Sequence, residues 1–325
     1  MDGLLDPLIW TRAIHFAATI AATGAIFFLA FVAEPAFRKA DAAGGMLAGM
    51  RAQLAAFSWI ALVAAIVSGA AWLLLLSAQV ADLPVAQAAI EGMPWTVLTD
   101  TDFGKAWTVR LIIAGLLAAS LPWLAVTNPV LSRQRATVAI ALAAALVGTL
   151  AWAGHAAAGT GVAGGVHLAS DILHLIAAAA WVGALIPLAL LLRAAMADHH
   201  HANLAIARVA VLRFSTLGIT SVGTLVGSGL VNTWVLAGSI PALIETDYGR
   251  LLLAKIALFL VMLLFAAVNR LWLTPRLTSS SIDLADGPLR GLGRNTVAEA
   301  ALGVIIIVIV ALLGTLQPGL DALAN

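Results

Sequence analysis

The sequence of 325 residues contains no cysteine, which excludes disulfide bonds, thiolate metal sites and iron–sulfur clusters. Charged residues are also scarce: they make up 10% of the chain, whereas soluble globular domains carry about 25%. With 62% hydrophobic residues and a mean hydropathy of +1.03, a soluble chain could not cover its own surface with polar groups. The composition therefore predicts an integral membrane protein, with membrane lipid as its surroundings.

Several other patterns are missing from the sequence. No ten-residue alternation indicates a transmembrane barrel, and no basic face indicates nucleic-acid binding. No nucleophile–base pair or phosphate-binding glycine loop indicates soluble hydrolase chemistry. The first apolar segment is too long for a signal peptide and follows no basic run, so we expect it to be a retained span.

Eight apolar segments are long enough to cross a bilayer, which takes about 20 helical residues. They lie at residues 8–33, 54–79, 106–126, 136–157, 167–192, 209–237, 251–271 and 296–316. The predicted fold class is thus all-α, a polytopic membrane protein with a single membrane domain over residues 1–325.

Basic residues gather in alternate loops of this arrangement. The loops between spans 1 and 2, 3 and 4, 5 and 6, and 7 and 8 hold most of the Lys and Arg, whereas the other loops are rich in Asp and Glu. The positive-inside rule then places both termini outside the cytoplasm. In a Gram-negative bacterium that side is the periplasm.

The second half of the chain repeats the first, and we expect four-helix repeats over residues 1–158 and 159–325. The matched positions are His15 with His174, Gly24 with Gly183, Ser68–Gly69 with Ser228–Gly229, and Thr101–Lys105 with Thr246–Arg250. Four spans is an even number, so both repeats enter the membrane in the same sense, and an axis along the membrane normal should relate them.

Polar residues cluster in the stretch GHAAAGTGVAGGVHLASDILH, which contains His155, His167, Asp171 and His174. In a helix, the last three lie at i, i+4 and i+7 and share one face. Such groups cost free energy beside lipid, and transition-metal binding is one reason to keep them there. Imidazole suits Cu, Zn, Fe and Ni, and Asp171 is expected to hold an imidazole rather than the metal. The alternative is a structural polar network.

His15 would lie at the same depth as His174. It either joins the metal ligands or donates to a backbone carbonyl of a neighbouring helix. Arg12 matches Asp171 in the repeat, so the two could pair if spans 1 and 5 face each other. The inner segment Asp198–His201 either accepts a departing metal ion or is a solvated turn, and we favour the turn.

The quoted stretch is continued by HLIAAAAWVGAL, then by TDYGRLLLAKIALFL, and the last span opens with Thr296–Glu299. These features resemble the copper resistance protein D (CopD-like) family of bacterial inner membranes. The resemblance implies a protein that helps copper across the inner membrane into the cytoplasm, beside a periplasmic copper-binding protein of the copper resistance C type. It also implies a periplasmic copper site at His155, His167, Asp171 and His174.

Two functional classes follow. The first is a copper transporter, which is not an enzyme; a sensor or scaffold that only binds copper is a variant of it. The second is a haem b oxidoreductase with His15 and His174, or His155 and His167, as axial ligands. The middle of the membrane is almost entirely apolar, with Asn232 and a few hydroxyl groups as polar stations, which speaks against ion passage.

Overall fold

The structure is a computed structural model that describes residues 6–39, 45–122, 129–154, 159–197, 201–279 and 284–319. Every regular element within these ranges is a helix. Eight of the helices found there are long and apolar enough to cross a membrane: Pro7–Lys39, Ala48–Ala81, Asp102–Ser120, Gln134–Ala153, Gly161–Ala197, His201–Leu236, Asp247–Ser279 and Asp286–Leu313. The prediction of an all-α, polytopic membrane protein is confirmed.

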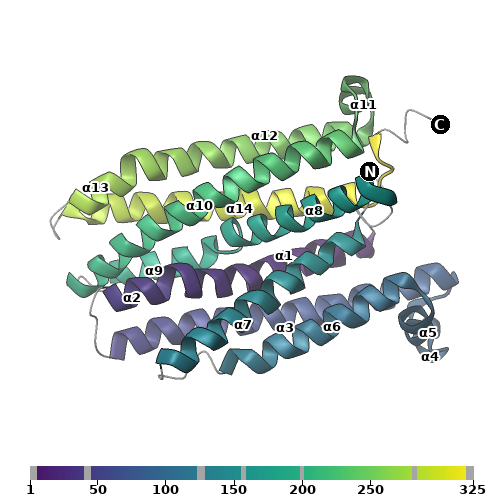
Figure 1. Ribbon diagram of the computed structural model, residues 1–325, viewed down its shortest axis with the longest axis horizontal. Helices are drawn as coiled ribbons and strands as arrows, with labels where there is room; N and C mark the ends of the chain where they lie inside the picture. The colour runs from purple at the N-terminus through teal and green to yellow at the C-terminus, as the bar shows by residue number, and fades with distance from the viewer. Residues whose placement is uncertain are drawn as a thin grey trace.

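The spans form an elongated bundle of roughly aligned helices (Figure 1). The first four are α1 (Pro7–Phe28, continued by η2, Leu29–Ala33, and α2, Glu34–Lys39), α3 (Gly45–Ala81), α6 (Asp102–Ser120) and α7 (Pro129–Gly148, continued by η4, Thr149–Ala153). The last four are α8 (Gly161–Trp181, followed by α9, Leu185–Ala197), α10 (His201–Leu236), α12 (Asp247–Val268, continued by η6, Asn269–Leu273, and α13, Thr274–Ser279) and α14 (Asp286–Leu313). Short helices α4 (Val85–Ile90), α5 (Met93–Asp100) and α11 (Ile240–Glu245) lie at one end.

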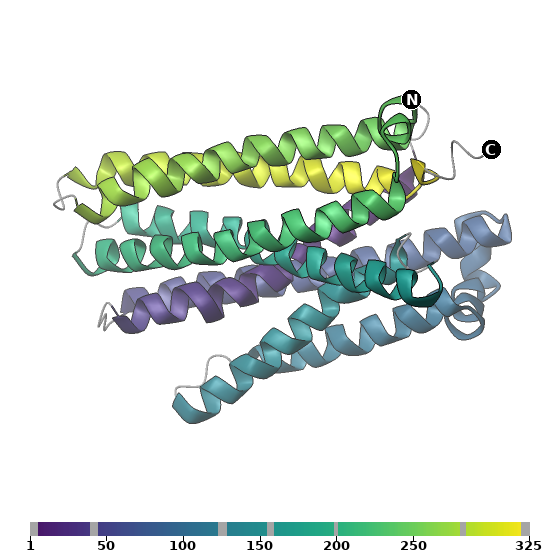
Figure 2. The ribbon, with the colours of Figure 1, turned by 45° about the horizontal axis from the view of Figure 1, so that its top comes forward.

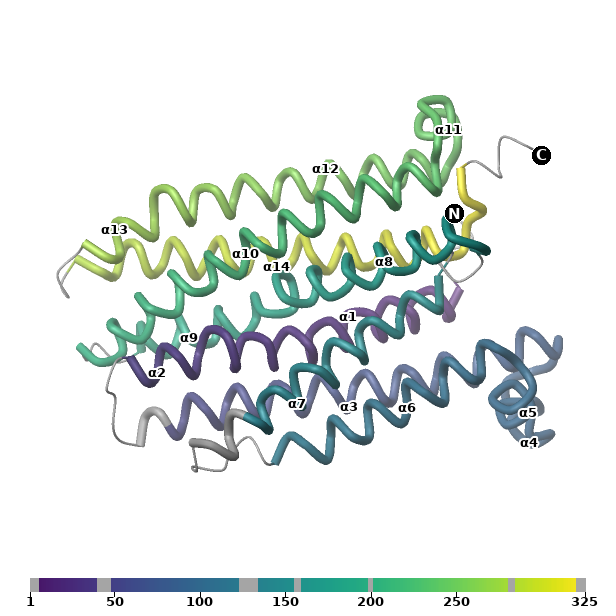
Figure 3. The backbone as a smooth tube through the Cα atoms, in the orientation of Figure 1, coloured from purple at the N-terminus to yellow at the C-terminus, as the bar shows by residue number. Residues whose placement is uncertain are grey.

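Helix α1 lies in the middle of the molecule. Helices α10, α12 and α14 lie on one side of it and α3 and α6 on the other, as both ribbon views show (Figures 1 and 2), and α7 and α8 both pack against α1. The start of α1 and the end of α14 lie at the same end of the bundle, as an even number of spans requires (Figure 3).

Several helices extend beyond the apolar segments that reveal them in the sequence. The sixth begins at His201 rather than near residue 209, and the seventh continues through η6 to Ser279 rather than ending near residue 271. Hydropathy marks only the part of a helix that lies in hydrocarbon, whereas the backbone hydrogen bonds continue into the polar interface.

Helices α6 and α12 begin in the same way. The Thr101 hydroxyl accepts a hydrogen bond from Gly104 N at 2.9 Å, and the Thr246 hydroxyl accepts one from Gly249 N at 3.0 Å. A Cβ on either glycine would overlap main-chain oxygens of the preceding short helix. The TDFGK and TDYGR motifs therefore both cap a helix start through their threonine.

Helix α1 crosses the fifth span where Gly24 meets Gly183, which lies in the turn between α8 and α9. A Cβ on Gly24 would overlap main-chain atoms of Gly183 and Ala179, and a Cβ on Gly183 would overlap those of Ile20 and Ala179. Ile20 and Ala179 are 159 positions apart, as are Gly24 and Gly183. The contact between Gly24 and Gly183 thus pairs a residue with its own counterpart in the expected repeat, and it brings the first and fifth spans together.

Candidate functional site

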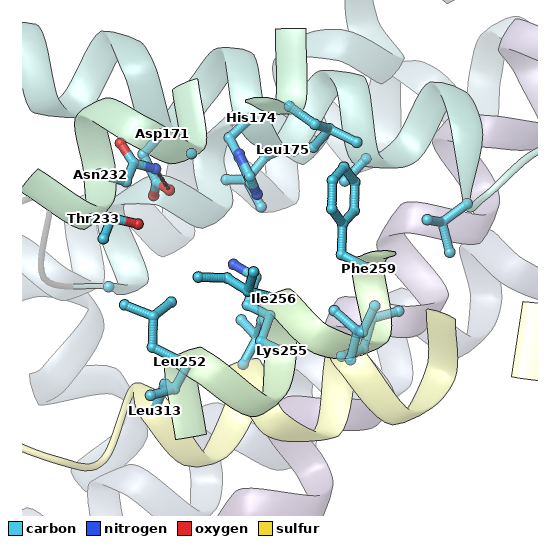
Figure 4. Close-up of a pocket in the computed structure, with 18 of the residues that line it drawn as sticks. Asp171, His174, Leu175, Asn232, Thr233, Leu252, Lys255, Ile256, Phe259 and Leu313 are labelled. Atoms are coloured by element: carbon cyan, nitrogen blue, oxygen red, sulfur yellow. Dashed lines mark hydrogen bonds between the residues drawn. The ribbon is translucent and has the colours of Figure 1, made fainter. Parts of the chain in front are cut away.

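A cavity of about 480 Å³ lies mainly among α8, α10, α12 and α14, with α1 completing one wall. Most of its lining is aliphatic or aromatic. Polar side chains gather in one part of it, and Figure 4 shows Asp171 and His174 of α8 opposite Lys255 and Leu252 of α12. An apolar pocket with a few convergent polar groups is the usual form of a ligand site.

One face of α8 contributes three titratable side chains to the lining of this cavity. His167, Asp171 and His174 all line it, as their i, i+4, i+7 spacing predicts. His167 is only 4% exposed. The helix begins at Gly161, so all three residues lie well inside it, where the backbone holds their spacing.

The hydrogen bonds of His174 fix which ring nitrogen is free. Its Nδ1 lies 3.0 Å from Oγ of Ser228, and that hydroxyl donates to the carbonyl of Thr224 at 2.6 Å. Because the hydroxyl proton is already used, Ser228 accepts from Nδ1–H, and Nε2 carries the lone pair. Nε2 is therefore the nitrogen through which His174 could bind a metal ion.

Asp171 has partners on two other helices. Asn232 of α10 donates to its Oδ1 at 3.2 Å. Lys255 of α12 interacts electrostatically with Asp171 and with His174.

A buried polar network lies beyond the deep end of the cavity. Trp181 and Met262 line that end and are buried. Glu299, 2% exposed, accepts from Asn269 Nδ2 at 2.7 Å and has a further side-chain hydrogen bond to Trp181. Asn295 in turn donates to Asn269 Oδ1 at 2.9 Å.

Sequence reasoning did not identify this network around Glu299. Asn269 opens the π-helical segment η6, a kind of distortion that is frequent at functional sites. A glutamate and two asparagines on apolar spans were the available signal, since ionisable groups within the membrane are rare and usually functional.

His15 lies apart from the α8 residues. Its Nδ1 is 2.9 Å from the carbonyl of Ala65 on α3, and its ring packs against Trp72 and Trp107 at centroid distances of 5.6 and 5.3 Å. It lines a separate cavity of about 10 Å³. The carbonyl contact is the one expected of a structural histidine.

The remaining predicted residues divide as follows. Arg12 lines the large cavity with Asp171, but it donates to the carbonyl of Gly314 at 3.1 Å. His155 and residues 198–200 lie outside the described residues, and His201 begins α10. Within the described ranges, no three His, Asp or Glu side chains are placed to hold one metal ion together.

The chain is similar to known proteins over most of its length. A family model described as copper resistance protein D matches residues 208–313, and one described as the N-terminal domain of copper resistance protein D-like proteins matches residues 2–165. No solved structure matches the chain.

Three curated relatives are each 30% identical to it. Copper resistance protein D of Pseudomonas syringae pv. tomato aligns over 307 residues, 91% of this chain and 93% of the relative. Inner membrane protein YebZ of Escherichia coli (strain K12) aligns over 69% of this chain and 72% of its own length. Copper transport protein CutJ of Bacillus subtilis (strain 168) aligns over 67% of this chain and 38% of its own length. The chain belongs to the copper resistance protein D family.

Proposed function

We propose that this protein takes up copper on the periplasmic side of the inner membrane and moves it inward. The observation that carries the proposal is the cavity wall of α8, where His167, Asp171 and His174 face one space in a chain of this family. Relatives named for copper resistance and copper transport support copper as the cargo.

His174 offers Nε2 toward the cargo while Ser228 holds Nδ1. A copper ion in the cavity would repel the ammonium group of Lys255 and replace its attraction to the Asp171 carboxylate, which we expect to orient an imidazole ligand rather than to bind the metal. We expect a further ligand from His155, which precedes α8 by six residues. Nitrogen ligands without cysteine suit Cu(II) or two-coordinate Cu(I).

A route inward is favoured by the polar groups beyond the cavity. Met262 supplies a soft thioether at its deep end, and Trp181 joins that end to Glu299. Glu299 and its asparagine neighbours are polar stations that hydropathy alone did not reveal. These polar groups weaken the argument that the middle of the membrane is too apolar for an ion to pass.

The proposal includes an orientation and a partner. Basic loops at the α2, α9 and α13 end put that end in the cytoplasm, and both termini in the periplasm. A small periplasmic protein of the copper resistance C type would deliver copper to the α8 end of the cavity.

The test is copper stoichiometry and uptake. We expect the detergent-purified wild type to retain copper by elemental analysis, and the His155→Ala/His167→Ala/His174→Ala variant to lose it. His201→Ala is the matched control, since it removes an exposed imidazole at the far end of α10. Proteoliposome uptake should fall with the triple variant alone. Equal copper content in the triple variant and the wild type would refute the proposal.

The haem alternative is tested on the same sample. His15 and His174 line different cavities, which does not favour them as a shared axial pair. A Soret band that shifts on dithionite reduction would establish haem and displace copper as the functional ligand. We expect a preparation without that band.

A further inference from the structure

Four of the residues that line the small cavity between α1, α3 and α6 carry a buried polar atom without a partner. These atoms are His15 Nε2 and Thr19 Oγ1 from α1, and Trp107 Nε1 and Arg110 Nη1 from α6. None of the four has a hydrogen-bond partner among the described residues, and each residue is at most 3% exposed. Buried polar groups in folded proteins are almost always paired, so four unpaired atoms around one space point to a ligand.

The chemistry of the four atoms is complementary. His15 donates Nδ1–H to the Ala65 carbonyl, which leaves Nε2 as an acceptor. Trp107 and Arg110 can only donate at this site. Thr19 can do either. A ligand that donates to His15 and accepts from Trp107 and Arg110 satisfies every group.

Size and charge narrow the choice of ligand. The cavity has about 10 Å³ of accessible volume, roughly that of one water molecule. The guanidinium of Arg110 disfavours a metal cation, and the lone pair of His15 disfavours an anion. A neutral molecule with two donors and two acceptors remains.

We propose that this cavity is a binding site for one structural water molecule that bridges α1 and α6. Its two protons go to His15 Nε2 and Thr19 Oγ1, and its lone pairs accept from Trp107 Nε1 and Arg110 Nη1. The inference is independent of the proposed copper transport.

The expected repeat relates the residues of this small cavity to residues that line the large cavity. Its residues match His174, Ala178, Leu252 and Lys255, at separations of 159 positions for α1 and 145 for α6. All four counterparts line the large cavity. Where the second half has alanine and leucine, the first half has threonine and tryptophan. The water site is thus the counterpart of the large cavity, narrowed by the larger side chains of Thr19 and Trp107.

The test is a high-resolution structure of the full chain. We expect one density peak within hydrogen-bonding distance of all four atoms. Thr19→Ser keeps the hydroxyl and should keep the peak. Thr19→Val combined with Trp107→Phe leaves two of the four partners, and the peak should vanish while the helices stay in place.

Three results would overturn the proposal. One is a wild-type map in which the four side chains pair with each other and hold no peak. Another is a peak that survives the Thr19→Val/Trp107→Phe replacement at full strength. The third is anomalous scattering from the site at the copper edge after copper loading, which would make it a metal site. If the double variant does not fold, the wild-type map with and without copper still decides.

Discussion

The crossing of α1 and the fifth span makes a quantitative test of the fold possible. In Gly183→Ala the new Cβ would overlap main-chain atoms of Ile20 and Ala179. No rotamer change can relieve this contact, because the obstructing atoms belong to two helix backbones. Overpacking a tight interior costs about 1–3 kcal/mol, and contacts with main-chain atoms put this variant at the upper end, about 3 kcal/mol.

A matched control separates this effect from the chemistry of replacing glycine by alanine. Gly218 lies within α10, and a Cβ there would meet nothing within 4 Å. Gly218→Ala should therefore stabilise the helix by about 0.5–1 kcal/mol. The two variants should differ by roughly 4 kcal/mol in the free energy of unfolding.

Thermal unfolding in detergent, followed by the fluorescence of the ten tryptophans, measures the difference. At about 2–4 °C per kcal/mol, Gly183→Ala should melt about 6–12 °C below the wild type, and Gly218→Ala slightly above it. Gly24→Ala should resemble Gly183→Ala, and the double variant should cost less than the sum because both changes disrupt one crossing. Equal melting temperatures for Gly183→Ala and Gly218→Ala would refute the close approach of the two helices.

Three further predictions address the cavity, a helix cap and the buried network. Leu252→Trp should fill part of the cavity and lower bound copper at least tenfold by elemental analysis, whereas Leu253→Trp, at a 40% exposed neighbour outside the cavity lining, should leave it unchanged; equal copper content in both would contradict the site. Thr246→Val removes the cap of α12 and should lower the free energy of unfolding by about 1 kcal/mol, while Thr246→Ser should retain it, as chemical denaturation can measure. Asn269→Ala removes the 2.7 Å hydrogen bond to Glu299 and should cost about 1.5–3 kcal/mol, and much less when Glu299→Leu is already present; a double-mutant cycle with additive costs would disprove the coupling.

The fold was largely predictable because the bilayer imposes a simple constraint. A span must be apolar for about 20 residues and must satisfy its own backbone, so composition alone reveals its place. The helix ends were less predictable. The start of α10 at His201 lies outside the apolar segment, where hydropathy carries no signal.

The candidate site was predictable only along one helix. Spacing on α8 placed His167, Asp171 and His174 on one face, but nothing local showed that Asn232 and Lys255 would face them from α10 and α12. Contacts between spans depend on how helices pack, which small residues permit but do not specify. One signal for Lys255 was available, because it follows the TDYGR motif as Arg110 follows TDFGK.

The two halves of the chain differ in how firmly the surrounding residues hold a buried cationic side chain, Arg110 in the first half and Lys255 in the second. Arg110 is fixed by two hydrogen bonds to Thr149, at 3.0 Å to the hydroxyl and 2.6 Å to the carbonyl. Its planar group also lies over Trp107, 4.6 Å from the ring centroid. Lys255, its counterpart, carries a compact charge on a flexible stem that reaches into open space. Moving Lys255 would give up its attraction to Asp171, which an incoming cation could replace, whereas moving Arg110 would break two hydrogen bonds in the interior. This difference favours the second half as the location of the proposed copper site.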